Sequence, residues 1–370
     1  MFDPAELLRP HIREMPPYEP ILPFEVLSEQ LGLPVERLVK LDANENSYGM
    51  LPAVRLALAE MPFAHIYPDP QSRELRLALA EYHGLPVENL LAGAGADELI
   101  DLLLRAVIEP GDVILNCPPT FGMYAFDGDV NRARVINLQR DPAFTIDLPA
   151  IQAAVAQYRP KLIFLASPNN PDGSLTRSEE IEHLLDLPCL LVLDEAYIEF
   201  AAPSASWIRE APRRGNLVVL RTFSKWAGLA GLRVGYGAFP SRLMPHLWKI
   251  KQPYNVSVAA AVAARVSLQH AAELVQTGER IIAERQRLMA QLQELPWLQP
   301  YPSQANFILC RVVGLPAREI KERLARAGIL VRYFDKPGLS DHIRISVGRS
   351  EDSQALMDEL RKVEVLCAQR

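Results

Sequence analysis

Residues 189–197 read CLLVLDEAY and residues 216–225 read NLVVLRTFSK, two apolar runs that each end in polar side chains. Two similar runs precede them, DVILNC at 112–117 and KLIFLASP at 161–168. Short continuous runs of branched apolar residues are typical of strands that are buried on both faces of a parallel sheet. The sequence therefore predicts an α/β fold with a mostly parallel sheet between helices.

Polar residues follow each of these four runs. They are the segment from Pro118 to Tyr124, Asn169 with Asn170, Asp194 with Tyr197, and Ser224 with Lys225. The carboxyl ends of parallel strands meet at one edge of a sheet, and open α/β sheets bind their ligands there. We therefore expect the reactive groups of this chain to gather along that edge.

The chain of 370 residues is longer than one hydrophobic core usually supports. Beyond Tyr254 and Asn255 the pattern changes to long helical stretches, then to the apolar runs NFILCRV, ILVRYF and HIRISVG, with a helix predicted from Pro316 to Ala327. We expect an N-terminal arm over residues 1–40, a large domain with the parallel sheet over 41–254, and a smaller α+β domain over 255–370.

Local residue types predict where two early helices begin or end. A short helix over residues 24–31 should stop at Gly32, because glycine adopts the left-handed conformation that ends helices. Ser72 is a candidate N-cap for the amphipathic segment RELRLALAEYHG, since its hydroxyl could accept a hydrogen bond from a free backbone N–H group.

The segment GAGADE at residues 93–98 opens the strongly apolar helix ELIDLLLRAVI. It departs from the dinucleotide-binding pattern, because Glu98 stands at the place of the third glycine, and no lysine follows as in a P-loop. A glycine-rich turn at a helix N-terminus still offers free N–H groups and the positive end of the helix dipole to a phosphate. Ser224 and Arg233 are candidates for further phosphate contacts.

Composition excludes several classes of partner. The net charge of −6 and the pI near 5.8 argue against nucleic acid or an anionic membrane as the main partner. No apolar run approaches the roughly 18 residues that span a bilayer, and the acidic, proline-broken start does not resemble a signal peptide, so we expect a cytoplasmic protein. The seven histidines show no metal-ligand spacing, and the four cysteines form no C-x-x-C pair, so we expect no metal site.

Lys225 stands at the end of a predicted buried strand and precedes WAGLAGLRVGYG, whose glycines at 228, 231 and 235 suggest tight turns. Desolvation lowers the pKa of an ammonium group and so yields a neutral amine that can condense with an aldehyde. A lysine is usually a solvated surface group; the neighbouring residues favour the reactive interpretation here.

Asp194 also stands where a strand leaves the sheet. A carboxylate there could cap a helix, bind a metal or pair with a protonated heterocycle, and no accompanying ligand cluster favours metal. Paired with a pyridine nitrogen, the aspartate would keep the ring protonated and electron-withdrawing. Tyr197 and Asn170 could donate hydrogen bonds to an oxygen on such a ring.

Four motifs resemble those of the fold-type-I aminotransferases in order and spacing: SPNNPDG, LDEAYIEF, TFSKWAGLAGLRVGYG and HIRISVG. More narrowly, LDANENSYG, YPDPQ, GAGADE, CPPTFGMY and DEAYIEF resemble the histidinol-phosphate aminotransferase family. The resemblance covers nearly the whole chain from about Leu41 onward. It implies a fold-type-I transferase dependent on pyridoxal 5'-phosphate (PLP), which moves amino groups between small molecules.

The resemblance also implies a role for each matching residue. Lys225 would hold the cofactor as a Schiff base and shuttle the proton, and Asp194 would pair with the pyridine nitrogen. Asn170 and Tyr197 would hold the phenolic oxygen, and Phe121 would stack on the ring. The phosphate would be bound by the backbone of Ala96 and Asp97 and by the side chains of Ser224 and Arg233.

Substrate and partner contacts follow from the same resemblance. Arg344 matches the arginine that binds a substrate anion, and Arg332 matches the one associated with a substrate phosphate. Tyr18 and Asn44 would line the substrate pocket. Tyr67, in YPDP, would reach the cofactor of the partner subunit, which implies a homodimer. The implied reaction transfers an amino group between histidinol phosphate and 2-oxoglutarate in L-histidine biosynthesis.

Three positions depart from the family pattern: Asp172 replaces a usual threonine, Ser47 a common proline, and Trp226 with Ala227 inverts the usual order after the lysine. Two other enzyme activities remain open on the same site, an aromatic amino-acid aminotransferase and a threonine-phosphate decarboxylase. Two non-enzymatic functions are also considered. A PLP-binding transcription regulator would need a DNA-binding domain, for which the arm before Leu41 is too short. The other is a catalytically inactive binding protein.

Overall fold

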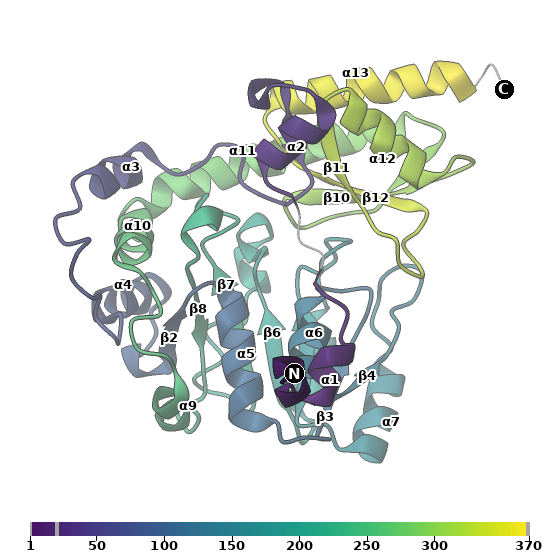
Figure 1. The fold of residues 1–370 in the computed structure, drawn as a ribbon. Coiled ribbons are helices and arrows are strands. Elements are labelled where there is room, and N and C mark those ends of the chain that lie inside the picture. The colour runs from purple at the N-terminus through teal and green to yellow at the C-terminus, as the bar shows by residue number, and fades with distance from the viewer. Residues whose placement is uncertain (1, 19–21, 368–370) are drawn as a thin grey trace.

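The computed structural model describes residues 2–18 and 22–367, with side chains up to residue 363, and contains two sheets with helices around each (Figure 1). The larger sheet has seven strands in the order β2-β8-β7-β6-β5-β3-β4. All of them run parallel except β8. The strands are β2 (Leu90–Gly93), β3 (Val113–Asn116), β4 (Arg134–Asn137), β5 (Leu162–Ala166), β6 (Leu190–Asp194), β7 (Leu217–Thr222) and β8 (Gly235–Ala238).

Each face of the larger sheet packs into its own apolar cluster, because successive strand residues point to opposite faces. Leu193 and Val219 belong to one cluster, and their neighbours Val192 and Val218 belong to the other. The first face is covered by α4 (Arg73–His83), α7 (Leu148–Tyr158), α8 (Ser178–Leu185), α10 (Val258–Gln269) and part of α11 (Ala271–Gln293). The second is covered by α5 (Ala96–Val107), α6 (Met123–Val130) and α9 (Met244–Ile250).

The smaller sheet has five strands in the order β1-β11-β12-β10-β9 and packs on a separate apolar cluster. Its first strand comes from the N-terminal part of the chain and pairs in parallel with β11. The elements are β1 (Val39–Leu41), β9 (Leu298–Pro300), β10 (Phe307–Val312), β11 (Ile329–Tyr333), β12 (His342–Ser346), α12 (Ala317–Arg326) and α13 (Ser350–Cys367). In Figure 1 these elements lie at the top, above the larger sheet.

The N-terminal segment runs over the surface before it enters β1. Its elements are η1 (Pro4–Leu7), α1 (Pro10–Glu14), α2 (Phe24–Leu31) and η2 (Val35–Arg37), and α3 (Pro52–Ala59) follows β1. The His11 ring Nε2 lies 3.3 Å from the Val130 carbonyl oxygen at the end of α6. No described helix is long and apolar enough to cross a membrane.

The four apolar runs read from the sequence are confirmed as β3, β5, β6 and β7, all parallel, and the helix that ends at Gly32 is confirmed as α2. Ser72 occupies the N-cap position of α4, but its side chain makes no capping bond, so that expectation is wrong. The Asp69 carboxylate instead accepts hydrogen bonds from the backbone N–H groups of Gln71 and Arg73, at 2.9 and 2.7 Å.

Gly235 was expected in a turn and lies instead in strand β8. A Cβ atom there would meet the backbone nitrogen of Ala96 at 2.5 Å, so the glycine allows β8 to pass close to the start of α5. The division into 1–40, 41–254 and 255–370 stays a prediction; β1, at the border of the first two segments, is a strand of the smaller sheet.

Candidate active site

The amine of Lys225 lies three residues beyond the end of β7, at the carboxyl edge of the larger sheet. Its Nζ donates a hydrogen bond to the Ala43 carbonyl oxygen at 3.1 Å and lies 5.8 Å from the centre of the Tyr197 ring. Burial, followed by the positive charge of Arg344, lowers the pKa of Lys225 from 10.5 to about 8. About a tenth of this amine is therefore neutral, and nucleophilic, at pH 7, far more than for a lysine with an ordinary pKa.

Asp194 is the last residue of β6 and is 5% exposed. Its carboxylate accepts a hydrogen bond from the Tyr124 hydroxyl at 2.6 Å and another from the Ala196 backbone N–H at 3.0 Å. No lysine, arginine or histidine of residues 2–18 and 22–363 lies within ion-pair distance of it. Burial raises the pKa of Asp194 to about 6, and no neighbouring cation among the described residues offsets this shift.

Tyr197 lies between Lys225 and a network that includes Arg344. The Asn44 amide donates to the Tyr197 hydroxyl at 3.1 Å, and Arg344 donates to the Asn170 side-chain oxygen at 2.5 Å and to the Asp42 carbonyl at 2.7 Å. The structure thus brings together five of the residues expected at this site, each from a different part of the chain.

Arg344 is buried, and its Nε has no hydrogen-bond partner among the described residues. Burial lowers the pKa of Arg344 to about 10, which still leaves the guanidinium charged at neutral pH. A buried cation with an unused donor is suited to a carboxylate or phosphate ligand.

Backbone and side-chain groups that could hold a phosphate surround the start of α5. Gly95 has φ +82°, and a Cβ atom there would meet the Arg233 Nη2 at 2.6 Å, so only glycine lets this arginine approach the turn. Arg233 donates to the Asp97 carboxylate at 2.8 Å, and Ser224 is buried against Thr222, whose hydroxyl donates to Ser224 at 2.9 Å. The first N–H groups of α5 have no partner within the helix, so this corner fits a phosphate group.

Phe121 and Arg332 lie next to groups of the site. The Phe121 ring packs edge-on against Tyr124, with 5.6 Å between the ring centres. Arg332 pairs with Arg344 across β11 and β12, and both guanidinium groups lie within 5.8 Å of the Phe334 ring centre. These two arginines therefore share one end of the site.

Tyr18 and Tyr67 are not brought into the hydrogen-bond network. Tyr18 is half exposed and packs on Phe126, with ring centres 5.8 Å apart. Tyr67 is 80% exposed and stacks on Tyr254 at 4.9 Å. Tyr67 thus lies on the outside of this subunit.

Sequence reasoning missed Tyr124 as the hydrogen-bond donor to Asp194, and it left Asp172 without a role. The Asp172 carboxylate accepts a hydrogen bond from the Ser174 backbone N–H at 2.9 Å and another from the Asn169 amide. It therefore holds the loop that presents Asn170. The Asp-x-Ser spacing was the available signal, since an aspartate commonly accepts from the backbone two residues later.

Among the described residues no cluster of three or more histidine, cysteine, aspartate or glutamate side chains could hold a metal ion. The cysteines at 117, 189 and 310 are buried and free. The chemistry available at the sheet edge is therefore that of an amine, an unpaired carboxylate and two anion-binding corners.

A lysine and a carboxylate in this arrangement, on this fold, are those of a PLP-dependent aminotransferase. The sequence model of the family "Aminotransferase class I and II" matches residues 36–360. The chain is 53% identical to the chloroplastic histidinol-phosphate aminotransferase of Nicotiana plumbaginifolia, over 96% of this chain and 86% of that protein. It is also 53% identical to the histidinol-phosphate aminotransferase of Roseiflexus castenholzii, over 96% and 98%. The chain belongs to the histidinol-phosphate aminotransferase family.

Solved structures agree with this assignment. The crystal structure of histidinol-phosphate aminotransferase from Sinorhizobium meliloti in complex with PLP matches with a TM-score of 0.88 and 29% identity, over 96% of this chain and 98% of that one. An L-threonine-O-3-phosphate decarboxylase from Porphyromonas gingivalis, at 24% identity and a TM-score of 0.77, shares the fold alone. The expected family, α/β fold class and enzyme class are confirmed.

Proposed function

We propose that this enzyme uses PLP held at Lys225 to transfer the amino group between histidinol phosphate and 2-oxoglutarate, giving imidazole-acetol phosphate and glutamate in L-histidine biosynthesis. The observation that carries the proposal is the pairing of a buried amine of lowered pKa with a buried carboxylate that lacks a cation. The relatives at 53% identity, both histidinol-phosphate aminotransferases by name, support the choice of substrate.

The cofactor, when bound, supplies an aldehyde carbon and a protonated ring that accepts the electron pair left at the substrate Cα. Asp194 would keep the proton on the ring nitrogen, and the Tyr124 hydroxyl holds this carboxylate in place. Tyr197 and Asn170 would bind the phenolic oxygen, and Phe121 would cover one face of the ring. Ala96, Asp97, Ser224 and Arg233 would bind the phosphate.

Lys225 is the base that moves the proton. Its Nζ, when free, would act as the general base that accepts the proton of the substrate Cα and as the general acid that gives it back. A base with a pKa of about 8 is close enough to neutral pH to both accept and release that proton.

Two arginines bind the anionic ends of the substrates. We assign Arg332 to the phosphate of histidinol phosphate and Arg344 to a carboxylate of glutamate, because guanidinium groups suit both anions. Their alignment across β11 and β12 lets one site accept both substrates in turn. Tyr18 and Asn44 line the same pocket.

We further propose a cytoplasmic homodimer in which Tyr67 reaches the phosphate of the partner's cofactor. Its ring is exposed and stacked on Tyr254, so its hydroxyl is available to another subunit. Analytical ultracentrifugation should give a dimer. Tyr67→Phe should leave the dimer intact and weaken PLP binding; a monomer with full activity would refute both parts.

A direct test of the mechanism is borohydride reduction of the PLP-loaded enzyme, followed by peptide mapping. The label should appear on Lys225, and Lys225→Ala should bind PLP without label and lose transamination. A label elsewhere, or an active Lys225→Ala variant, would refute the assignment.

Substrate choice is tested separately, by comparing kcat/KM for histidinol phosphate, phenylalanine and tyrosine with 2-oxoglutarate as acceptor. Histidinol phosphate should be preferred, and Arg332→Ala should reduce kcat/KM for it far more than for phenylalanine. Equal losses for all donors would remove the phosphate role of Arg332. Preference for the aromatic amino acids, or CO2 release from phosphothreonine, would identify one of the two alternative activities.

A further inference from the structure

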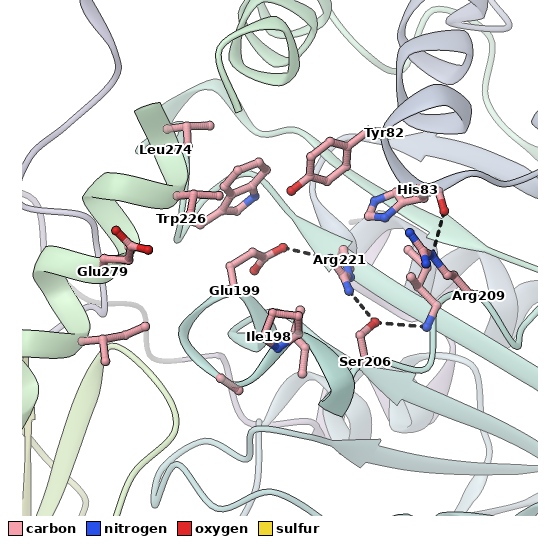
Figure 2. A pocket seen from close by; sticks show the side chains of 16 residues that line it. Tyr82, His83, Ile198, Glu199, Ser206, Arg209, Arg221, Trp226, Leu274 and Glu279 are labelled. Carbon is pink, nitrogen blue, oxygen red and sulfur yellow. Dashed lines mark hydrogen bonds and ion pairs between the residues drawn. The ribbon is translucent and has the colours of Figure 1, made fainter. Parts of the chain in front are cut away.

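A second cavity, of about 580 Å³, lies between the end of α4, the η4 turn (Ile198–Phe200), β7 and α11 (Figure 2). None of the residues assigned above to cofactor or substrate lines it. Its volume is within the range of small-molecule binding sites. The side chains that give it chemical character are Tyr82, Glu199, Arg209, Arg221, Trp226 and Glu279.

The cavity opens on the face of the larger sheet opposite to Asp194. The side chain of Asp194 lies on the face of the sheet that also contains Leu220. Arg221 follows Leu220 in the strand, so its side chain lies, like that of Val219, on the opposite face. Trp226 is the chain neighbour of Lys225. Its carbonyl oxygen accepts a hydrogen bond from the Asn46 amide at 2.8 Å. The cavity is therefore separate from the active site but shares a wall with it.

Negative charge is in excess along the inner wall. Arg221 pairs with the buried Glu195 at 2.9 Å and with one oxygen of Glu199 at 3.3 Å. The other carboxylate oxygen of Glu199 has no hydrogen-bond partner among the described residues. Figure 2 shows Glu279 and Arg209 at opposite sides of the cavity, so the Glu199 and Glu279 end attracts a cation.

Aromatic and apolar groups complete the same end. The Tyr82 and Trp226 rings stack with their centres 6.1 Å apart and an interplanar angle of 20°. Trp226 is 3% exposed, and among the described residues nothing accepts a hydrogen bond from its indole N–H. Leu274 and Ile282 of α11 line the remaining wall. Aromatic faces beside a carboxylate are a recurrent arrangement for binding organic ammonium groups.

We propose that this cavity is a second binding site that takes a small organic cation, an ammonium group carried on an aryl or alkyl body. The ammonium lies against Glu199 and the aromatic pair, and the apolar body lies against α11. The inference does not depend on which amino donor the active site prefers.

The titration of Glu199 gives the site a characteristic pH dependence. Burial raises the pKa of Glu199 to about 7, with Arg221 opposing this shift and Glu195 adding to it. The other charged or titratable groups near it in the described part of the chain are Tyr82, His83, Arg209, Tyr236 and Glu279. A cation binds the ionised carboxylate, so affinity rises as the pH passes from 6 to 8 and then levels off.

The probe is N,N-dimethylphenethylamine, which is protonated near neutral pH, retains one N–H donor and, as a tertiary amine, cannot condense with the PLP aldehyde. We expect calorimetric titration of the PLP-loaded enzyme to show binding at one site per chain, with the cofactor absorption band unchanged. The matched anion 3-phenylpropionate, of similar shape, should bind at least tenfold more weakly.

Two variants locate the site. Glu199→Gln should weaken probe binding about tenfold and abolish its pH dependence, and Val275→Trp, which fills the cavity from an exposed position of α11, should abolish binding while retaining both carboxylates. Glu88→Gln, in a separate hollow beside Trp248, is the control and should bind normally. Absent binding, equal binding of the anion, a changed cofactor band, or unaltered affinity in both variants would overturn the proposal.

Discussion

Asp194 and Glu195 are successive buried carboxylates at the end of β6, yet their surroundings are opposite. Glu195 pairs with Arg221 at 2.9 Å and accepts hydrogen bonds from the Ser206 hydroxyl and the Trp207 backbone N–H, at 2.8 and 2.5 Å. Among the described residues, the donors to Asp194 are both neutral groups, the Tyr124 hydroxyl and the Ala196 N–H. The charge of Glu195 is therefore neutralised inside the fold, and that of Asp194 is not.

The difference separates a structural carboxylate from a functional one. A buried charge with its counter-ion in place fixes local geometry, whereas a buried charge without one favours a cationic ligand. The alternation of strand side chains puts the two on opposite faces of the sheet, so a single dipeptide serves both purposes. The following substitutions test this separation, from the largest expected effect to the smallest.

Asp194→Asn should reduce kcat by roughly 10³–10⁴-fold, or about 4–5 kcal/mol, because the neutral amide cannot hold the proton on the ring nitrogen. The asparagine oxygen can still accept from the Ala196 N–H, and its NH2 group can donate to the Tyr124 hydroxyl oxygen, so the fold and the Tm of the cofactor-free protein should change little. A variant that keeps more than a tenth of the wild-type kcat would show that Asp194 is not the functional member of the pair.

Glu195→Gln should lower the free energy of unfolding by about 3 kcal/mol, because it leaves Arg221 buried without its main counter-ion. The activity of the folded fraction should stay within about threefold of wild type. Urea unfolding of the cofactor-free protein measures the loss. Glu182→Gln, which breaks an exposed pair with Arg214, is the matched control and should cost less than about 0.5 kcal/mol.

Tyr124→Phe removes one donor from Asp194 and should lower kcat about tenfold, equivalent to about 1.4 kcal/mol. The ring would still stack on Phe164, from which it lies 5.1 Å, so the packing should survive. Spectroscopic titration of the bound cofactor should show that the ring nitrogen loses its proton at a lower pH than in the wild type. An unchanged titration with lowered kcat would mean that the tyrosine acts elsewhere.

At pH 5, Glu199→Gln should have the smallest effect on stability, roughly 1 kcal/mol or less, because the folded-state carboxyl is still protonated there and the glutamine is neutral as well. The pKa of Glu199 is raised in the fold from 4.5 to about 7, so the wild type loses stability as the pH rises between these two values, and the glutamine variant does not. Wild-type stability should therefore fall relative to the variant as the pH rises from 5 to 7. A large loss at pH 6 would show that Glu199, and not Glu195, neutralises Arg221.

Much of the fold was predictable because four strands are continuous apolar runs, and the helix ending at Gly32 carries a clear stop signal. Strands β4 and β8 were not. β4 (Arg134–Asn137) has an exposed or half-buried pattern and β8 begins at a glycine, so neither has the apolar run of a buried strand. The role of Gly235 depends on the backbone of Ala96, more than a hundred residues away, and no local pattern contains that contact.

In the candidate site, Lys225 and Asp194 could be chosen from the sequence because each directly follows or ends a recognisable strand. The contacts between residues that are far apart in the sequence could not be predicted. Tyr124 reaches Asp194 from a helix seventy residues earlier, and Arg344 reaches Asn170 from the smaller sheet. Such contacts depend on how the two sheets pack against each other. The sequence therefore predicts which residues belong to the site better than it predicts which of them contact one another.

The strand β1 couples the two sheets mechanically. Val39–Leu41 moves with the smaller sheet because it is hydrogen-bonded to β11, and the next three residues touch the active site. The Asp42 carbonyl accepts from Arg344, the Ala43 carbonyl accepts from Lys225, and the Asn44 amide donates to Tyr197. A displacement of the smaller sheet would therefore also move the hydrogen-bond acceptor of the Lys225 amine.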